Sequence, residues 1–230
     1  MAGQVCHESF YKSNVLIESI SMDFAQLILT QCYSKCTQGL LDQSILGNAH
    51  VLELGFVFLL ALNIIISTNV RAGTGLLSIA LAPLVHQYTS TDMAPLIPLI
   101  QKNVSSNLPL GSNVVTKELD WITLETTSPS KRSNVFNTEE HPIDLLLAVD
   151  CLYHPSLIPP FLTTLDYLAT PGRTAVLIVS ELRADDVTRE FLETWLSMPA
   201  WEIWRVPNDT LGKHYVIWFG WKSVNIVQNT

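Results

Sequence analysis

Short apolar runs alternate with amphipathic segments along most of the chain. The runs at 143–153 and 173–182 stay almost uninterruptedly apolar up to their last residues, as strands do that are buried on both faces of a sheet. Further strands are predicted at 50–54, 88–92 and 113–121, and helices at 74–85, 93–104, about 155–169 and 184–196. Because strands and helices alternate, we expect an α/β fold with a mostly parallel sheet and helices on both faces.

Both ends of the chain depart from this alternation. Residues 201–206 and 214–221 are β runs separated by "PNDTLGK", which predicts a C-terminal hairpin. Residues 15–33 have the spacing of an amphipathic helix, but they contain nothing that we can assign to chemistry. We therefore expect an N-terminal segment 1–44 that is helical or poorly ordered, a main domain 45–222 and a tail 223–230.

One segment, "FVFLLALNIIISTNVR" from Phe56 to Arg71, fits neither the strand before it nor the helix after it. A membrane span needs about 20 apolar residues. This run is shorter and Asn63 interrupts it, so we do not expect a span. We interpret 56–71 as an insert, and our hypothesis is a retained or wrongly assigned intron. A splice from Gly55 to Ala72 would preserve the reading frame.

Composition and charge restrict the classes of function. Of the 230 residues, 48% are apolar and 15% are charged, which is enough apolar material for the core of one domain. The net charge of -8 argues against a direct nucleic-acid partner, because phosphate binding needs a basic face. It fits a basic protein substrate better. The first ten residues lack a basic segment followed by an apolar run, so we expect no secretory signal.

Four cysteines are present, and no pattern joins them into a metal site. Cys32 and Cys36 could lie one helical turn apart, yet no second Cys/His pair completes a zinc site. Free thiols are typical of a reducing compartment, so we expect a cytoplasmic protein that could also occur in the nucleus.

Without residues 56–71, the chain reads "HVLELG-AGTGLLSIALAP". Glycines let the backbone approach a cofactor closely, and a helix N-terminus offers unpaired N–H groups to a carboxylate. The Gly-x-Gly-x-Gly spacing resembles motif I of the seven-strand methyltransferases that use S-adenosylmethionine, more than the G-x-G-x-x-G of dinucleotide folds. This resemblance implies S-adenosylmethionine as the cofactor, bound by Glu53, Gly55, Ala72, Gly73 and Gly75.

Three further candidates follow from the same resemblance. Asp92 ends a predicted strand, where the family has an acid that accepts hydrogen bonds from the ribose hydroxyls. Trp121 resembles the family's tryptophan beside the adenine, and Ala148 would line the cofactor pocket. From the residues alone, Asp92 could also cap the following helix, a role that can coexist with ribose binding, and Trp121 could be a core side chain.

The stretch "AVDCLYHP" carries the most specific signal in the chain. Asp150 closes an apolar run, where an acid is costly to bury unless backbone N–H groups or a ligand satisfy it. Asp150 and Tyr153 match the D-x-x-Y signature of a protein-lysine methyltransferase family, and the residues from 180 onward resemble its fungal ribosomal members. The resemblance implies that Asp150 orients the incoming amine and that Tyr153 forms a wall of its channel.

We therefore expect a Rossmann-like, seven-strand protein-lysine N-methyltransferase that depends on S-adenosylmethionine. The resemblance implies a protein substrate, such as a protein of the large ribosomal subunit. We expect a monomer without a metal ion, a direct nucleic-acid partner or a membrane partner. Two alternatives stay open. The chain could methylate another class of substrate, or the insert could leave it inactive.

Overall fold

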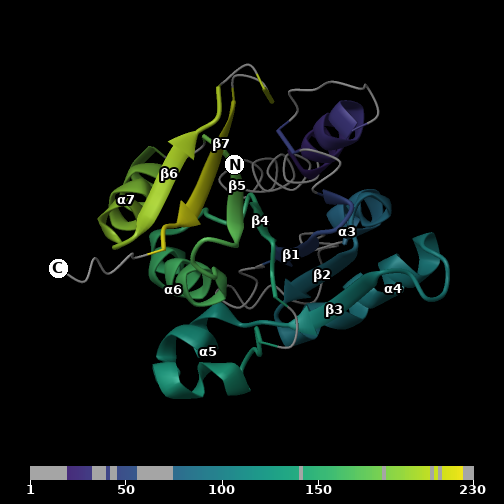
Figure 1. The fold of residues 1–230 in the computed structure, drawn as a ribbon, viewed down its shortest axis with the longest axis horizontal. Helices are drawn as coiled ribbons and strands as arrows, with labels where there is room; N and C mark the ends of the chain where they lie inside the picture. The colour runs from purple at the N-terminus through teal and green to yellow at the C-terminus, as the bar shows by residue number, and fades with distance from the viewer. Residues whose placement is uncertain are drawn as a thin grey trace, which may run out of the picture.

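The computed structural model describes residues 20–32, 40–41, 46–55, 75–139, 142–182, 185–207, 210–211 and 214–224. Within them, seven strands form one sheet in the order β3-β2-β1-β4-β5-β7-β6 (Figure 1). The strands are β1 (His50–Leu54), β2 (Gln87–Asp92), β3 (Val114–Glu118), β4 (Leu145–Val149), β5 (Ala175–Glu181), β6 (Trp201–Arg205) and β7 (Tyr215–Lys222). Pairs among β1 to β5 are parallel, and β7 is antiparallel to β5 and β6. The predicted α/β sheet with a C-terminal hairpin is confirmed.

The helices that connect these strands are short. They are α3 (Leu76–Leu81), α4 (Ile97–Asn107), α5 (Trp121–Thr126), α6 (Ile158–Leu168) and α7 (Asp185–Ser197), with 3-10 turns η1 (Ala82–Leu84), η2 (Ala94–Leu96), η3 (Pro129–Asn134) and η4 (Pro155–Leu157). Prolines lie in the first turns of η2 and α4. Proline lacks the backbone N–H that a helix interior uses, so it is tolerated only there. The predicted helix 93–104 is consequently divided into η2 and α4.

The sheet separates two hydrophobic clusters. Neighbouring strand residues point to opposite faces, so Leu146 and Val176 lie in one cluster while Leu145 and Leu177 lie in the other. The first cluster packs against α5, α6 and α7, and the second against α3 and residues 20–32. Helices therefore cover both faces of the sheet. This leaves the amino ends and the carboxyl ends of the strands as places for binding.

Residues 20–32 form a helix that belongs to the second cluster. Its buried positions follow a helical period on one face, and they are Ile20, Phe24, Ala25, Ile28 and Cys32. This confirms the predicted amphipathic helix over the part that the structure describes, and the remainder of 15–33 lies outside it. The apolar face packs with residues of β1, β4 and β5, so this helix contributes to the core of the sheet.

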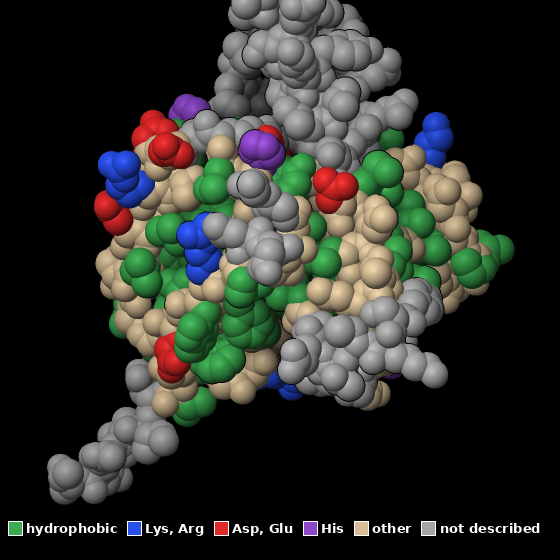
Figure 2. Space-filling view, turned by 90° about the horizontal axis from the view of Figure 1, so that it is seen from above, with side chains coloured by type: hydrophobic (Ala, Val, Ile, Leu, Met, Phe, Trp, Pro, Cys, Tyr) green, Lys and Arg blue, Asp and Glu red, His purple; other side chains and the backbone are tan. Residues whose placement is uncertain are grey.

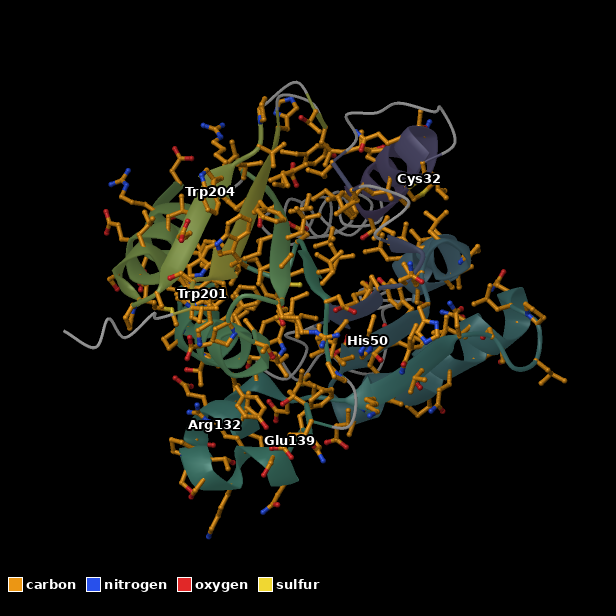
Figure 3. The ribbon with its side chains drawn as sticks, viewed as in Figure 1. Cys32, His50, Arg132, Glu139, Trp201 and Trp204 are labelled. Carbon is orange, nitrogen blue, oxygen red and sulfur yellow. The ribbon has the colours of Figure 1, made fainter. Side chains whose placement is uncertain are left out.

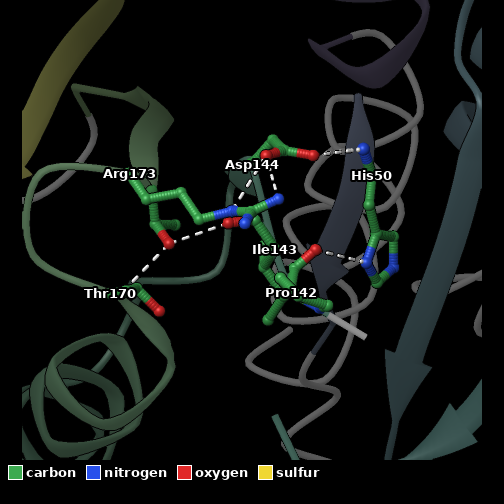
Figure 4. A network of polar contacts seen from close by, with 7 residues as sticks. His50, Pro142, Ile143, Asp144, Thr170 and Arg173 are labelled. Carbon is green, nitrogen blue, oxygen red and sulfur yellow. Dashed lines mark hydrogen bonds and ion pairs between the residues drawn. The ribbon is translucent and has the colours of Figure 1, made fainter. Parts of the chain in front are cut away.

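A polar network closes the edge where the strands begin (Figure 4). Asp144 Oδ2 accepts a hydrogen bond from the backbone N–H of His50 at 2.9 Å, and Asp144 Oδ1 pairs with Arg173 Nη2 at 2.9 Å. The His50 ring contacts Pro142 O at 3.2 Å and Thr89 Oγ1 at 2.8 Å. These contacts join β1, β2, β4 and β5 at their amino ends, so the opposite edge is the one left for ligands.

The C-terminal hairpin is attached to α6 through Asp166. Trp201 Nε1 donates to Asp166 Oδ1 at 3.1 Å, and Lys222 Nζ pairs with the same oxygen at 2.9 Å. Figure 3 labels Trp201 and Trp204 on β6. Hydrophobic side chains reach the surface at several places (Figure 2), and the exposed fractions of Trp204 and Trp221 are 44% and 40%. The hairpin is therefore anchored on one side and carries aromatic surface on the other.

Candidate cofactor and active site

The predicted site residues gather at the carboxyl edge of the sheet, because parallel strands end on the same side. Glu53 and Gly55 lie at the end of β1, Asp92 ends β2, and Asp150 follows β4. Of the predicted cofactor residues, Ala72 and Gly73 lie outside the described residues, as does the predicted insert 56–71. The central part of the site can therefore be built from three neighbouring strands.

Glu53 carries a carboxyl group that is half-buried in the sheet. Its Oε2 accepts hydrogen bonds from the Tyr88 hydroxyl at 3.0 Å and from the Ser90 hydroxyl at 3.3 Å. Burial raises the pKa of this carboxyl to about 7, and the two hydrogen bonds oppose the rise. A carboxyl near its pKa at neutral pH gains negative charge when a cation binds beside it. Glu53 is thus suited to a positively charged ligand.

Gly55 is required by the close approach of β2. Its backbone N–H donates to Thr91 O at 2.9 Å, and a β carbon here would lie 2.5 Å from that oxygen and 2.7 Å from Asp92 Oδ2. Gly75 precedes α3 with φ 74°, in the left-handed region that glycine adopts readily. Both glycines therefore have structural reasons for their identity, and cofactor contact stays a prediction for each.

Asp92 is fully buried at the end of β2. Its Oδ1 accepts a hydrogen bond from the backbone N–H of Met93 at 2.8 Å. The cap of η2 is Met93, and no side chain caps that turn. The structure therefore does not show the helix-capping role that the sequence left open for Asp92. Ribose binding by Asp92 stays a prediction.

Trp121 and Ala148 are core residues on the face covered by α5, α6 and α7. Trp121 begins α5, is fully buried, and its ring centroid lies 5.0 Å from that of Phe161. Ala148 is 1% exposed on β4. The core position that the sequence allowed for Trp121 is thus occupied, and contacts of either residue with a cofactor stay predictions.

Asp150 begins the D-x-x-Y turn with φ 54°, which is left-handed and uncommon for a residue other than glycine. Its backbone N–H donates to Val179 O at 2.7 Å, which holds this conformation against β5. Tyr153, the last residue of the turn, is 39% exposed. The turn therefore leaves the sheet abruptly, with its acid fixed at the edge and its tyrosine open to solvent.

Two residues near this turn were missed by the sequence reasoning. The Cys151 thiol is buried and donates to Leu54 O at 3.0 Å, so it links the end of β4 to the end of β1. Burial raises the pKa of this thiol well above its usual value, and three carboxylates add to the rise, namely those of Asp150, Glu53 and Asp92. Ser180, near the end of β5, is 5% exposed. A serine within the apolar run "AVLIVSEL" was the available signal.

The described residues also bear on metal binding and on membrane insertion. Among those that the structure describes, no group of three or more His, Cys, Asp or Glu side chains is placed to hold a metal ion. No helix within the described ranges is long and apolar enough to cross a membrane. A depression between α4 and β3 is lined by residues such as Gln101 and Leu110. It lies beside the loop that precedes β3, and therefore at the amino ends of the strands, away from the candidate site.

Comparison with known proteins gives a consistent picture. Residues 64–197 match the family described as lysine methyltransferase. The protein N-lysine methyltransferase METTL21A of Danio rerio is 32% identical over 134 residues, which cover 57% of this chain and 55% of that protein. The ribosomal lysine N-methyltransferase 5 of Candida glabrata is 26% identical over 168 residues, which cover 55% of this chain and 48% of that protein. The chain thus spans about half the length of these relatives.

The similarity to a solved structure supports the assignment of the fold and of nothing else. The O-methyltransferase of Bacillus cereus, solved in complex with SAH, superposes with a TM-score of 0.52 at 16% identity. The match covers 86% of this chain and 78% of that one. The chain therefore shares the Rossmann-like fold of that methyltransferase.

Proposed function

The chain belongs to the lysine methyltransferase family, and from this premise we propose that it transfers a methyl group from S-adenosylmethionine to a lysine side chain of a protein. The observation that carries the proposal is the D-x-x-Y turn. Asp150 is held in a strained conformation at the sheet edge, next to the strand ends that carry Glu53 and Asp92. Strained residues of this kind cluster at functional sites.

The residues at the edge fit the charge and shape of the cofactor. When bound, S-adenosylmethionine supplies a methyl group on a positively charged sulfur, which the lone pair of an amine can take over. Glu53 would face the cationic methionine portion, and Asp92 would accept hydrogen bonds from ribose hydroxyls. Gly55 lets the end of β1 lie directly against Asp92, because a β carbon there would lie 2.7 Å from Asp92 Oδ2.

Asp150 and Tyr153 would act on the lysine. Only the neutral amine has a free lone pair, and removing the proton at pH 7 costs about 4.6 kcal/mol for a pKa near 10.4. A second positive charge nearby and partial desolvation both lower the pKa of the amine. Asp150 would accept a hydrogen bond from the amine and fix its direction, while Tyr153 would form a wall of its channel. Correct orientation alone can supply about 7–11 kcal/mol of the barrier reduction.

We propose a ribosomal protein as the substrate. The support is the similarity to the ribosomal lysine N-methyltransferase of Candida glabrata, together with the net charge of -8, which suits a basic partner. A cytoplasmic or nuclear location, which would bring enzyme and substrate together, is part of the same proposal.

Incubation with isotopically labelled S-adenosylmethionine tests the function. The full chain would be mixed with ribosomal proteins purified from cells that lack its gene, and labelled residues would be identified after acid hydrolysis. We expect labelled methyllysine. Label on small amines or on hydroxyl groups, with none on lysine, would assign the chain to another substrate class. Failure to bind the cofactor by calorimetry would indicate an inactive chain.

A further inference from the structure

Ser180 has a buried hydroxyl group without a hydrogen-bond partner among the residues that the structure describes. The residue is 5% exposed, and its Oγ forms no hydrogen bond with any other part of the chain that the structure describes. Other buried hydroxyls are bonded, for example that of Ser78 to Gly75 O and that of Thr164 to Pro160 O. Burying a hydroxyl without a hydrogen bond is unfavourable, so a serine at an inner position of an apolar strand lowers the stability of the fold. A group outside the chain can satisfy it.

The position of Ser180 places it beside the D-x-x-Y turn. Val149 of β4 pairs with Val179 of β5, and the backbone N–H of Asp150 donates to Val179 O at 2.7 Å. Ser180 is the next residue along β5. By the alternation of side chains, Ser180 points to the same face as Ile178 and Ala148, the face of the first hydrophobic cluster. On the other side, Ser180 pairs with the apolar Val216 of β7.

We propose that Ser180 Oγ is a second acceptor for the target amine, beside Asp150, and that this pair limits the degree of methylation. The inference rests on the proposed function. A neutral, unmodified lysine amine has two N–H bonds besides the lone pair that attacks the methyl group. One N–H can be donated to Asp150 and the other to Ser180 Oγ, so both acceptors are satisfied during the first transfer.

Later transfers lose these hydrogen bonds. Each transfer forms one N–C bond, breaks one C–S bond of the cofactor and releases one proton from the amine. The neutral monomethylated amine therefore has one N–H, and the dimethylated amine has none. With the dimethylated amine, the Ser180 hydroxyl again lacks a partner and faces a methyl group. The third transfer is consequently disfavoured, and mono- and dimethyllysine accumulate.

The variant Ser180→Ala tests this role, with Ser105→Ala as the matched control. Ser105 is exposed on α4, and its hydroxyl donates to Lys102 O. Four quantities would be measured for each full-length protein: Tm, the Kd for S-adenosylmethionine, the rate of the first transfer, and the mono-, di- and trimethyllysine contents of ribosomal proteins from gene-deleted cells. The control should match the wild type in all four.

For Ser180→Ala we expect an unchanged or raised Tm, because an unpaired buried hydroxyl is removed, and an unchanged Kd for the cofactor. The first transfer should slow roughly 3- to 10-fold, as for one lost uncharged hydrogen bond, while the trimethyllysine fraction rises. An active wild type with a variant of identical rate and product pattern would overturn the role of Ser180. So would a lowered Tm with equal slowing of all three transfers, which indicates a purely structural residue. A wild type that labels no lysine would overturn the proposed function and this role together.

Discussion

Glu53 links the chemistry of the site to the stability of the fold. Burial raises the pKa of its carboxyl from 4.5 to about 7, so the folded protein binds a proton that the unfolded chain releases. The contribution of Glu53 to stability is therefore complete below about pH 4.5 and declines as the pH rises toward 7. A shift of this size corresponds to about 3 kcal/mol at most.

Glu53→Gln should consequently remove much of this pH dependence. Glutamine keeps the shape and stays neutral, so the variant should lose less unfolding free energy than the wild type between pH 5 and pH 8. Urea denaturation at the two pH values gives this difference directly. Parallel pH profiles for the two proteins would show that Glu53 ionises in the folded state as it does in the unfolded chain.

Asp92→Ala should weaken binding of S-adenosylmethionine by roughly 1.5–3 kcal/mol, the contribution of a lost pair of charge-assisted hydrogen bonds. Isothermal titration calorimetry measures it, and Asp186→Ala in the first turn of α7 is the control. Unchanged affinity in a folded Asp92→Ala protein would exclude Asp92 from the cofactor site.

Asp150→Asn should keep the fold and cofactor affinity while slowing methyl transfer about 10- to 100-fold. Asparagine keeps the shape of the side chain and loses the charge that positions a cationic lysine, which is worth about 1.5–3 kcal/mol in a charge-assisted hydrogen bond. The rate at saturating cofactor is the measurement. A variant as fast as the wild type would be incompatible with the role of Asp150.

Single site residues could be predicted where they lie at or near the end of a predicted strand. Glu53, Asp92 and Asp150 each lie at or next to the end of a predicted strand, and parallel topology places such ends together. Cys151 and Ser180 were not predictable in this way. The thiol of Cys151 bonds the carbonyl of a distant strand, and the isolation of the Ser180 hydroxyl depends on its neighbours in the folded sheet.

Elements were predicted well in type and less well in extent. The strand expected at 113–121 ends at Glu118, because Asp120 Oδ1 accepts a hydrogen bond from Ile122 N at 2.9 Å and so begins α5 at Trp121. A capping residue can thus convert the end of an apolar run into a helix start. The periodicity of apolar residues does not report such a local cap.

The helix at 20–32 gives a prediction at this scale, because its apolar face is part of the core. Phe24 is fully buried, so Phe24→Ala should lower the free energy of unfolding by about 3–5 kcal/mol. Met22 on the same helix is 58% exposed, and Met22→Ala should change it by less than about 0.5 kcal/mol. Chemical denaturation compares the two. Equal, small effects would mean that the helix is separable from the domain.

At the scale of the whole molecule, the predicted insert 56–71 separates the two described glycines of the cofactor motif, Gly55 and Gly75. We expect no place for its apolar side chains in the core that the described residues form, because overpacking typically costs about 1–3 kcal/mol. Exposed apolar surface promotes association. We therefore expect a chain lacking 56–71 to bind S-adenosylmethionine more tightly and to be more soluble.

Calorimetry and light scattering on the two chains would measure this. Equal cofactor affinity and equal solubility would show that 56–71 is a tolerated native part of the protein. Transcript sequence across the segment is an independent check, because abundant mRNA that always encodes it would rule out the intron hypothesis.

The most direct test of the central claim, that this fold methylates lysine in a protein, is mass spectrometry of ribosomal proteins from cells with and without the gene. The account predicts a lysine-containing peptide that loses its methyl groups on deletion. Wild-type protein should restore them, and Asp150→Asn should restore far less. Lysine methylation that is the same in both kinds of cell, across the ribosomal proteins and the remaining proteome, would contradict it.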